Sequence, residues 1–255
     1  MPGLLEVRRL TKRFGGVQAV VDVSFSVPPG ILYAVIGPNG AGKTTLFNLV
    51  SGYLAADSGE VRFNGQSIRG WPAHRIARAG LARTFQNLEL FPGMTVLENV
   101  MVGCDARVRC GWLDALFGTG RRRAANATSR EEARRLLALF SLDGVADIPA
   151  GSLAYGMQRM VEIVRAFALR PKLLLLDEPA AGLNPAERQQ LAAVLQQARA
   201  QGVTVLLVEH DVDLVMTVAD RILVLDQGRV LAEGTPEEIQ THPAVVAAYL
   251  GEEVS

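Results

Sequence analysis

The stretch Gly37-Pro38-Asn39-Gly40-Ala41-Gly42-Lys43-Thr44-Thr45 decides the fold of this chain. It follows the apolar run Ile31–Ile36 and precedes the helical pattern Leu46–Val50, so a strand, a glycine-rich loop and a helix succeed one another. Glycines let backbone N–H groups converge on an anion, and the following helix turns its positive end toward the same point. The pattern therefore predicts a phosphate-binding loop rather than an ordinary glycine-rich turn, with contacts from Gly37, Asn39, Gly40, Ala41, Gly42, Lys43, Thr44 and Thr45.

Two side chains of this loop are expected to carry chemistry. Lys43 should lie between the β- and γ-phosphates of a nucleotide, and the Thr44 hydroxyl should bind Mg²⁺. A phosphate loop alone does not distinguish a kinase from a GTPase or a motor, so the class of protein depends on a second motif.

That second motif supplies two carboxylates. The run Lys172–Leu176 has the length of a strand and is followed by Asp177 and Glu178, at the end of the strand where α/β sheets bind ligands. Asp177 fits the Mg²⁺ shell, directly or through water, and Glu178 fits a general base that orients or deprotonates water. A solvated strand end is the alternative, which a nucleotide-binding chain makes the weaker interpretation.

The remaining patterns predict an α/β fold. The first 65 residues or so are rich in strand patterns, residues from about Glu98 to Arg170 are helical, and strands alternate with helices thereafter. We expect a P-loop NTPase core with a mostly parallel sheet, an N-terminal antiparallel β subdomain and an inserted helical subdomain. One domain would span residues 1–255, with the core in 1–97 and 166–255 and the insertion in 98–165. The individual elements expected are strands at Leu5–Leu10, Val20–Val27, Val61–Phe63 and Val203–Val208, and helices at Ser129–Phe140, with Ser129 and Glu132 at capping-box spacing, Pro185–Gln201 and Val212–Ala219.

Composition excludes several classes of protein. The 26 Lys and Arg balance 26 Asp and Glu, and the pI of about 6.9 disfavours a nucleic-acid partner. Two cysteines, Cys104 and Cys110, lack the spacing of a zinc site and indicate free thiols in a reducing compartment. Charged residues interrupt the N-terminus before a signal-peptide core forms, and no apolar run approaches the roughly 20 residues of a spanning helix. We therefore expect a soluble, cytoplasmic chain.

One segment departs from this balance. Residues Asp105–Arg135 hold eight arginines and four acidic residues, a local excess of four positive charges. A solvated face is the favoured interpretation, and a patch facing phospholipid headgroups is the alternative.

The motifs together resemble those of the ATP-binding subunits of ABC transporters, over nearly the whole chain. The two motifs above are similar to the Walker motifs of that family. Arg83–Asn87 resembles its Q-loop, and Ser152–Arg159 stands where its signature Leu-Ser-Gly-Gly-Gln falls. Ala180–Pro185 resembles its D-loop, and Val208–Asp211 contains its switch histidine.

The resemblance implies a head-to-tail dimer in which each ATP, with Mg²⁺, lies between the phosphate loop of one subunit and the signature of the other. Gly156, opening a helix over Met157–Leu169, would offer its N–H to the γ-phosphate. His210 would contact the γ-phosphate within its own subunit, although a core histidine is the alternative. The residues that would meet ATP across the interface are Leu153, Ala154, Tyr155, Gly156 and Met157.

Two further residues take roles from the resemblance. Gln86 would touch Mg²⁺ or water and report nucleotide occupancy to a membrane partner. Phe14 stands where the family often has an aromatic residue stacked on adenine, with a partly buried turn residue as an equal alternative. The predicted catalytic residues are therefore Lys43, Gln86, Glu178 and His210, and the predicted metal ligands are Thr44, Gln86 and Asp177.

The signature departs from the family pattern at three positions. Ala154 replaces a serine, Tyr155 a glycine and Met157 a glutamine, so one hydroxyl is lost while the backbone donors remain. We expect a competent site that lacks one side-chain hydrogen bond. A binding-only regulatory cassette is the alternative, and four intact residues argue against it: Lys43, Asp177, Glu178 and His210.

Several strings narrow the resemblance to the larger ATP-binding subunit of the branched-chain amino-acid uptake system. They are Ala82–Asn87, Leu153–Gly156, Asp177–Pro185 and the tail from Gly234 to Gly251. The resemblance implies a second ATP-binding subunit (a sister subunit or another copy), two transmembrane permeases, an extracytoplasmic solute-binding protein acting indirectly, and a place on the inner face of the cell membrane. Related importers of urea or amides and the lipopolysaccharide-export ATPase share much of this pattern. A soluble ABC ATPase acting on ribosomes, DNA or cluster assembly is a more distant alternative.

Overall fold

The computed structural model describes residues 3–84, 88–106 and 120–250, and an antiparallel sheet forms one end of it. Its strand order is β2-β1-β4-β5. The first residues of β1 alternate between buried and more exposed, as in a sheet with one covered face. The bounds are β1 (Leu5–Phe14), β2 (Val17–Val27), β4 (Ser58–Phe63) and β5 (Gln66–Ser67), which confirms the strands predicted in this region.

The second sheet is mostly parallel and carries the ligand-binding edge. Its order in the described part of the chain is β10-β9-β3-β8-β7-β6, and only β10 runs antiparallel to its neighbour. Every residue of β3, β7 and β8 is buried, because helices or the other sheet cover both faces. The bounds are β3 (Leu32–Ile36), β6 (Leu81–Arg83), β7 (Leu173–Asp177), β8 (Thr204–Val208), β9 (Arg221–Asp226) and β10 (Arg229–Gly234).

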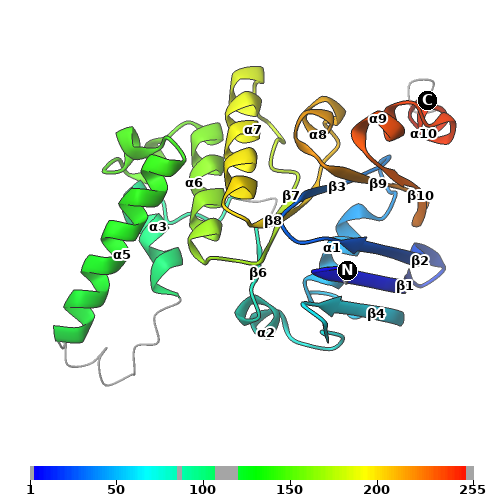
Figure 1. Ribbon diagram of the computed structural model, residues 1–255, viewed down its shortest axis with the longest axis horizontal. Helices are drawn as coiled ribbons and strands as arrows, with labels where there is room; N and C mark the ends of the chain where they lie inside the picture. Colours follow the sequence, from blue (N-terminus) through cyan, green and yellow to red (C-terminus); the bar gives the residue numbers. More distant parts are fainter. Residues whose placement is uncertain (1–2, 85–87, 107–119, 251–255) are drawn as a thin grey trace.

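Helices gather in two groups (Figure 1). At the end away from the antiparallel sheet lie α3 (Val96–Asp105), α5 (Gly120–Leu139) and α6 (Tyr155–Ala168). The others flank the sheets: α1 (Lys43–Val50), α2 (Ala73–Arg78), α7 (Pro185–Ala200), α8 (Val212–Val218), α9 (Pro236–Gln240) and α10 (Pro243–Leu250).

Two hydrophobic cores meet across the parallel sheet. Alternate residues of β7 point to opposite sides, so Leu174 and Leu176 pack with the helical group, and Leu173 and Leu175 pack with α1 and the antiparallel sheet. The helical end and the antiparallel end are therefore joined through a single shared sheet.

The predicted start of a helix at Ser129 is wrong. Helix α5 begins at Gly120, so Ser129 is a buried interior residue and its spacing to Glu132 caps nothing. Inside a helix the backbone N–H groups already have partners four residues earlier, which removes the need for a cap. The helix expected over Met157–Leu169 likewise begins earlier, at Tyr155.

Strand register brings three segments to one edge. Val208, the last residue of β8, pairs with Val35 of β3 on one side and with Asp177 of β7 on the other. Since the three strands are parallel, their carboxyl ends lie side by side. The loops that follow β3, β7 and β8 therefore share one edge of the sheet.

Candidate functional site

The glycine-rich loop connects β3 to α1. Gly42 precedes the helix with a left-handed φ of 98°, and a Cβ added there would collide with the carbonyl oxygen of Ala19 on β2. Only glycine fits this close approach. No side chain caps α1, so its first N–H groups turn toward the loop.

Lys43 is the buried cation of this loop. The residue is only 7% exposed, and its Nζ donates to the carbonyl oxygens of Gly37 at 2.6 Å and Pro38 at 2.9 Å. The neighbouring Asn39, Gly40 and Thr44 are exposed. The loop thus presents an ammonium group and backbone donors at a surface that an anion can reach.

Asp177 lies at the end of β7, paired with an arginine that the sequence analysis quoted without a role. Arg83 donates to its Oδ2 at 3.0 Å, and the same guanidinium donates to Asn48 and Ser51 of the α1 region. Burial raises the pKa of the Asp177 carboxyl above its ordinary value, and the Arg83 charge opposes that rise. Oδ1 is buried and has no hydrogen-bond partner within the described part of the chain.

Glu178 adopts a backbone conformation that is rare for a residue with a side chain. Its φ is 46°, in the left-handed region, and its N–H donates to Val208 at 2.9 Å. Its Oε2 lies 3.9 Å from Nδ1 of His210, whose side chain is 57% exposed. Strain of this kind costs about 1–2 kcal/mol and is typical of functional positions.

The structure adds a residue to which the sequence analysis assigned no role. Glu209, directly before His210, has no exposed surface, and its carboxylate accepts backbone N–H groups of the segments that follow both β7 and β8. Its burial was not evident because an acidic residue at a strand end is usually solvated.

The signature segment, residues 152–157, lies at the start of α6. Ala154 precedes α6 without a side-chain cap, and Ala154 and Tyr155 are exposed while Leu153 and Met157 are half-buried. A Cβ on Gly156 would meet the Glu187 carboxyl of α7, so α6 and α7 touch at their starts. Among the described residues no hydrogen bond joins 152–157 to 37–45.

For two of the predicted site residues this edge provides no test. Phe14 is 49% exposed at the end of β1, with the Lys12 ammonium 5.6 Å from its ring centroid. Gln86 lies outside the described residues. Neither prediction is tested by these contacts.

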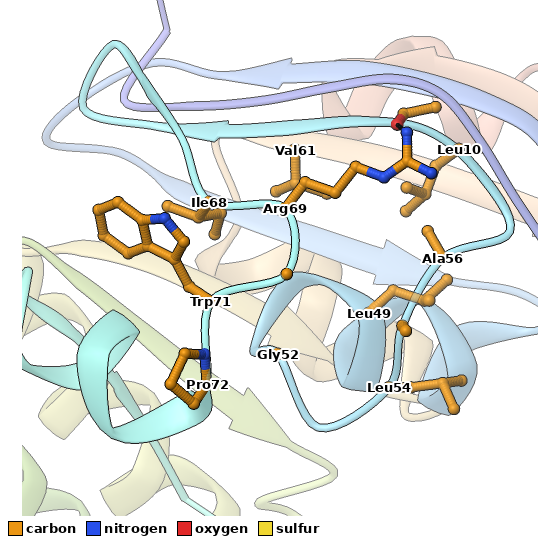
Figure 2. A pocket seen from close by; sticks show the side chains of 13 residues that line it. Leu10, Leu49, Gly52, Leu54, Ala56, Val61, Ile68, Arg69, Trp71 and Pro72 are labelled. Atoms are coloured by element: carbon orange, nitrogen blue, oxygen red, sulfur yellow. Dashed lines mark hydrogen bonds between the residues drawn. The ribbon is translucent and has the colours of Figure 1, made fainter.

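A cavity of about 320 Å³ lies elsewhere, between β1, β4 and the C-terminal end of α1. Figure 2 shows its apolar lining, with Leu49, Val61 and Trp71 around it, and the long side chain of Arg69 crossing it. No residue of the glycine-rich loop lines it, so this cavity is distinct from the candidate site.

A glycine-rich loop between a buried strand and an uncapped helix, with carboxylates at the end of a nearby parallel strand, defines a P-loop nucleotide-binding protein. The comparisons with known proteins specify the class further. The family model described as ABC transporter matches residues 20–181, and a model described as branched-chain amino acid ATP-binding cassette transporter matches residues 229–255. The chain belongs to the ABC transporter family, as one of its ATP-hydrolysing subunits.

Curated relatives match from end to end. The chain is 47% identical to the high-affinity branched-chain amino acid transport ATP-binding protein BraF of Pseudomonas aeruginosa, over 98% of each chain. It is 43% identical to LivG of Escherichia coli K12, a protein of the same description, again over 98% of each. A crystal structure of the ADP conformation of MJ1267, an ATP-binding cassette of an ABC transporter, aligns with a TM-score of 0.83 at 32% identity, covering 98% of this chain and 100% of that one.

The described helices have no membrane-spanning segment. None of them combines the length and the apolar character needed to cross a bilayer. Cys104, one of the two cysteines predicted to be thiols, is buried and is not part of a disulfide bond; Cys110 lies outside the described residues.

Proposed function

We propose that this chain drives the uptake of branched-chain amino acids, as the larger ATP-binding subunit of an importer. The observation that carries the proposal is the end-to-end similarity to BraF and LivG, together with the separate match of residues 229–255, outside the residues that the ABC transporter model matches. An ATPase subunit does not itself touch the solute, so the substrate assignment rests on similarity to whole subunits and not on the nucleotide site.

In this proposal the glycine-rich loop binds the phosphates of ATP. The N–H groups of residues 37–45 and the positive end of α1 surround the β- and γ-phosphates, and Lys43 exchanges its carbonyl partners for phosphate oxygens. Phosphate oxygens carry full negative charge, so they are stronger acceptors than the carbonyl oxygens of Gly37 and Pro38.

The same edge suits a magnesium ion. The buried Oδ1 of Asp177 lacks a partner in the described chain, and the exposed Thr44 is the second residue of helix α1. The described residues contain no cluster of three or more His, Cys, Asp or Glu side chains able to hold a metal, which fits an ion that takes most of its ligands from phosphate and water. Bound Mg²⁺ would neutralise charge that develops on the phosphates. Gln86 would complete this set.

Glu178 and His210 are proposed to act on the attacking water. Glu178 would accept a proton from the water, and His210 would hold the water and the γ-phosphate in line. The support is their separation: Nδ1 and Oε2 are 3.9 Å apart, on loops from two adjacent strands. Each group can therefore reach a shared third atom.

The start of α6 is proposed to complete the site of a second ATP-binding subunit. Its N–H groups have no side-chain cap, Ala154 and Tyr155 are exposed, and no hydrogen bond of the described residues joins this segment to the glycine-rich loop of its own chain. A helix start without a cap favours an anion, and Gly156 would donate to the γ-phosphate held by the partner. The flanking Leu153 and Met157 would meet the nucleotide from either side.

A transmembrane permease is proposed to dock on a cleft whose lining includes residues that precede and follow position 86 in the sequence. The cleft, of about 280 Å³, combines Arg83 and Thr84 before that residue, Glu89 and Phe91 after it, and Glu162, Arg165 and Ala166 of α6. Phe91 is 47% exposed beside the Arg165 guanidinium. Docking here would place the chain on the inner face of the membrane and link nucleotide occupancy to the permeases, with the external binding protein acting through them.

The test is to tag the chain in its native cell, extract the membranes gently and identify the proteins that co-purify. We expect two permeases and a second, shorter ATPase, and loss of the gene should abolish uptake of labelled leucine but not of labelled urea. Recovery of ribosomal or DNA-repair proteins without membrane subunits would overturn the transporter, and a selective loss of urea uptake would overturn the substrate.

A further inference from the structure

A buried carboxylate lies between the loops that follow β7 and β8, at the edge of the sheet that carries Glu178 and His210. Glu209 follows β8 directly, and its side chain has no exposed surface, whereas its neighbour His210 is more than half exposed. Acidic side chains are almost never fully buried unless they are paired or hydrogen-bonded. The partners of Glu209 therefore explain its place.

Those partners belong to two different loops. Oε1 accepts the backbone N–H of Ala180 at 2.6 Å, in the loop that begins at Glu178. Oε2 accepts the N–H of His210 at 3.2 Å and, at 3.5 Å, that of Asp211. A single carboxylate thus joins the loop after β7 to the loop after β8.

A second link between the same loops is weaker. Arg188 of α7 forms an ion pair with Asp211 at 2.9 Å and donates from Nε to the carbonyl oxygen of Leu183 at 3.2 Å. The Arg188 side chain is 45% exposed, so water and salt screen this pair. Of the two links, only the one made by Glu209 is shielded from solvent.

Stability alone does not account for a carboxylate at this position. Burial raises the pKa of the Glu209 carboxyl above its ordinary value, and the three N–H donors only oppose that rise. A raised pKa means that folding disfavours the charged form at neutral pH, so a neutral side chain would be easier to bury.

We propose that Glu209 is a positioning residue for ATP hydrolysis, which fixes the backbone of the two loops so that Glu178 and His210 face the same water. This inference rests on the roles proposed above for those two residues. The 3.9 Å between their side chains depends on the relative placement of the two loops, which the Glu209 carboxylate joins directly. A small shift of either loop would move a reacting group out of line.

The test is Glu209→Gln in the full chain, assembled with the membrane subunits that co-purify with it. An amide has one acceptor and one donor end, so in either orientation it sets N–H against N–H on one loop while keeping the size of the side chain. We expect kcat for ATP to fall about 10- to 100-fold, with KM within about twofold, while the thermal midpoint falls no more than in the control variant below.

A matched control is Asp220→Asn. Asp220 also accepts a backbone N–H, that of Leu32 at 2.8 Å, but at the opposite end of β3 from the glycine-rich loop. We expect it to lower the thermal midpoint without changing kcat. Equal loss of kcat in the two variants, in proportion to lost stability, would overturn the positioning role, and so would full turnover in Glu209→Gln.

Combined variants separate this inference from the proposed function. If Glu209 acts through His210, adding Glu209→Gln to His210→Ala should cause a smaller loss than the product of the two separate losses. A loss equal to the product would overturn the inference alone. Full turnover in both Glu178→Gln and His210→Ala would instead overturn the proposed hydrolytic site, and the role of Glu209 with it.

Discussion

Two helices of this chain begin without a side-chain cap at places where the family motifs fall, and they differ in what surrounds them. At α1 the glycine-rich loop precedes the helix directly, and the Lys43 side chain donates to two carbonyl oxygens of that loop. At α6 the preceding Ala154 and the first residue, Tyr155, are exposed to solvent. By contrast, α3, α7 and α9 each begin with a complete capping box.

On the function proposed above, the difference divides the two helix starts: one anion site would be built within the chain, and the other would be half of a site. Capping residues satisfy N–H groups that are otherwise left for water or a ligand. The start of α1 has a loop, a cation and nearby carboxylates of its own, so we expect a single chain to bind ATP there. The start of α6 has only backbone donors, so its contribution should appear only when a second subunit supplies the nucleotide.

Glu178→Gln should have the largest effect and should divide binding from turnover. The amide cannot take a proton from water, so ATP turnover of the assembled transporter should fall about 10²- to 10⁴-fold. The α1 site is untouched, and ATP affinity, measured by titration, should stay within about twofold. Glu60→Gln, on β4 and away from the edge, is the control. If the Glu178→Gln variant turns ATP over at the rate of the unchanged protein, Glu178 is not the general base.

Gly156→Val tests the half-site at α6. The new side chain meets the Glu187 carboxyl, which itself caps α7 through Asn184, so the start of α6 must move. We expect turnover of the assembled transporter to fall about tenfold or more, while the full chain alone binds ATP as before. Gly144→Ala is a matched control because nothing lies near its added Cβ. Weakened ATP binding by the single chain would contradict the division into two sites.

Phe14→Ala tests whether the α1 site extends to the base of ATP. Stacking of a base on an aromatic ring contributes about 1–3 kcal/mol, and a half-exposed ring belongs at the low end, so the ATP Kd should rise about five- to tenfold. Val17→Ala truncates another exposed apolar side chain, the cross-strand partner of Phe14 on β2. An unchanged Kd, measured with the same chain by titration, would leave Phe14 as a turn residue only.

Much of this architecture is readable from local pattern. The continuous apolar runs of β7 and β8 and the glycine spacing of the loop are set by burial and by close backbone approach, which act on neighbouring residues. Strand β6 was not predicted, because its three residues are too few for any periodicity. The start predicted at Ser129 was wrong because helix-favouring residues also precede it. A capping-box spacing does not by itself make a helix begin there.

The edge of the sheet that carries Glu178 and His210 was only partly predictable, for a different reason. Glu178 and His210 follow buried runs, so their place at the edge follows from sheet topology. The burial of Arg83 and Glu209 depends instead on segments far along the chain: Arg83 meets Asp177 and Glu209 meets Ala180. Neither residue type is usually buried, so local composition points away from the observed arrangement.

Ala154→Ser should have the smallest effect and should sharpen the contrast between the two helix starts. A serine before α6 can bond a γ-phosphate oxygen of the partner's nucleotide, a bond worth about 0.5–1.5 kcal/mol, so turnover of the assembled transporter should rise about two- to tenfold. The same hydroxyl can instead cap α6 itself, which would raise the thermal midpoint of the single chain.

Pro72→Ser separates these two outcomes, since it offers the same kind of cap to α2, another helix without one. If both variants raise the midpoint and only Ala154→Ser raises turnover, the hydroxyl acts on the phosphate as well as on the helix. If turnover is unchanged in both, the side chain at residue 154 is immaterial, and the backbone donors of α6 alone serve the second subunit's nucleotide.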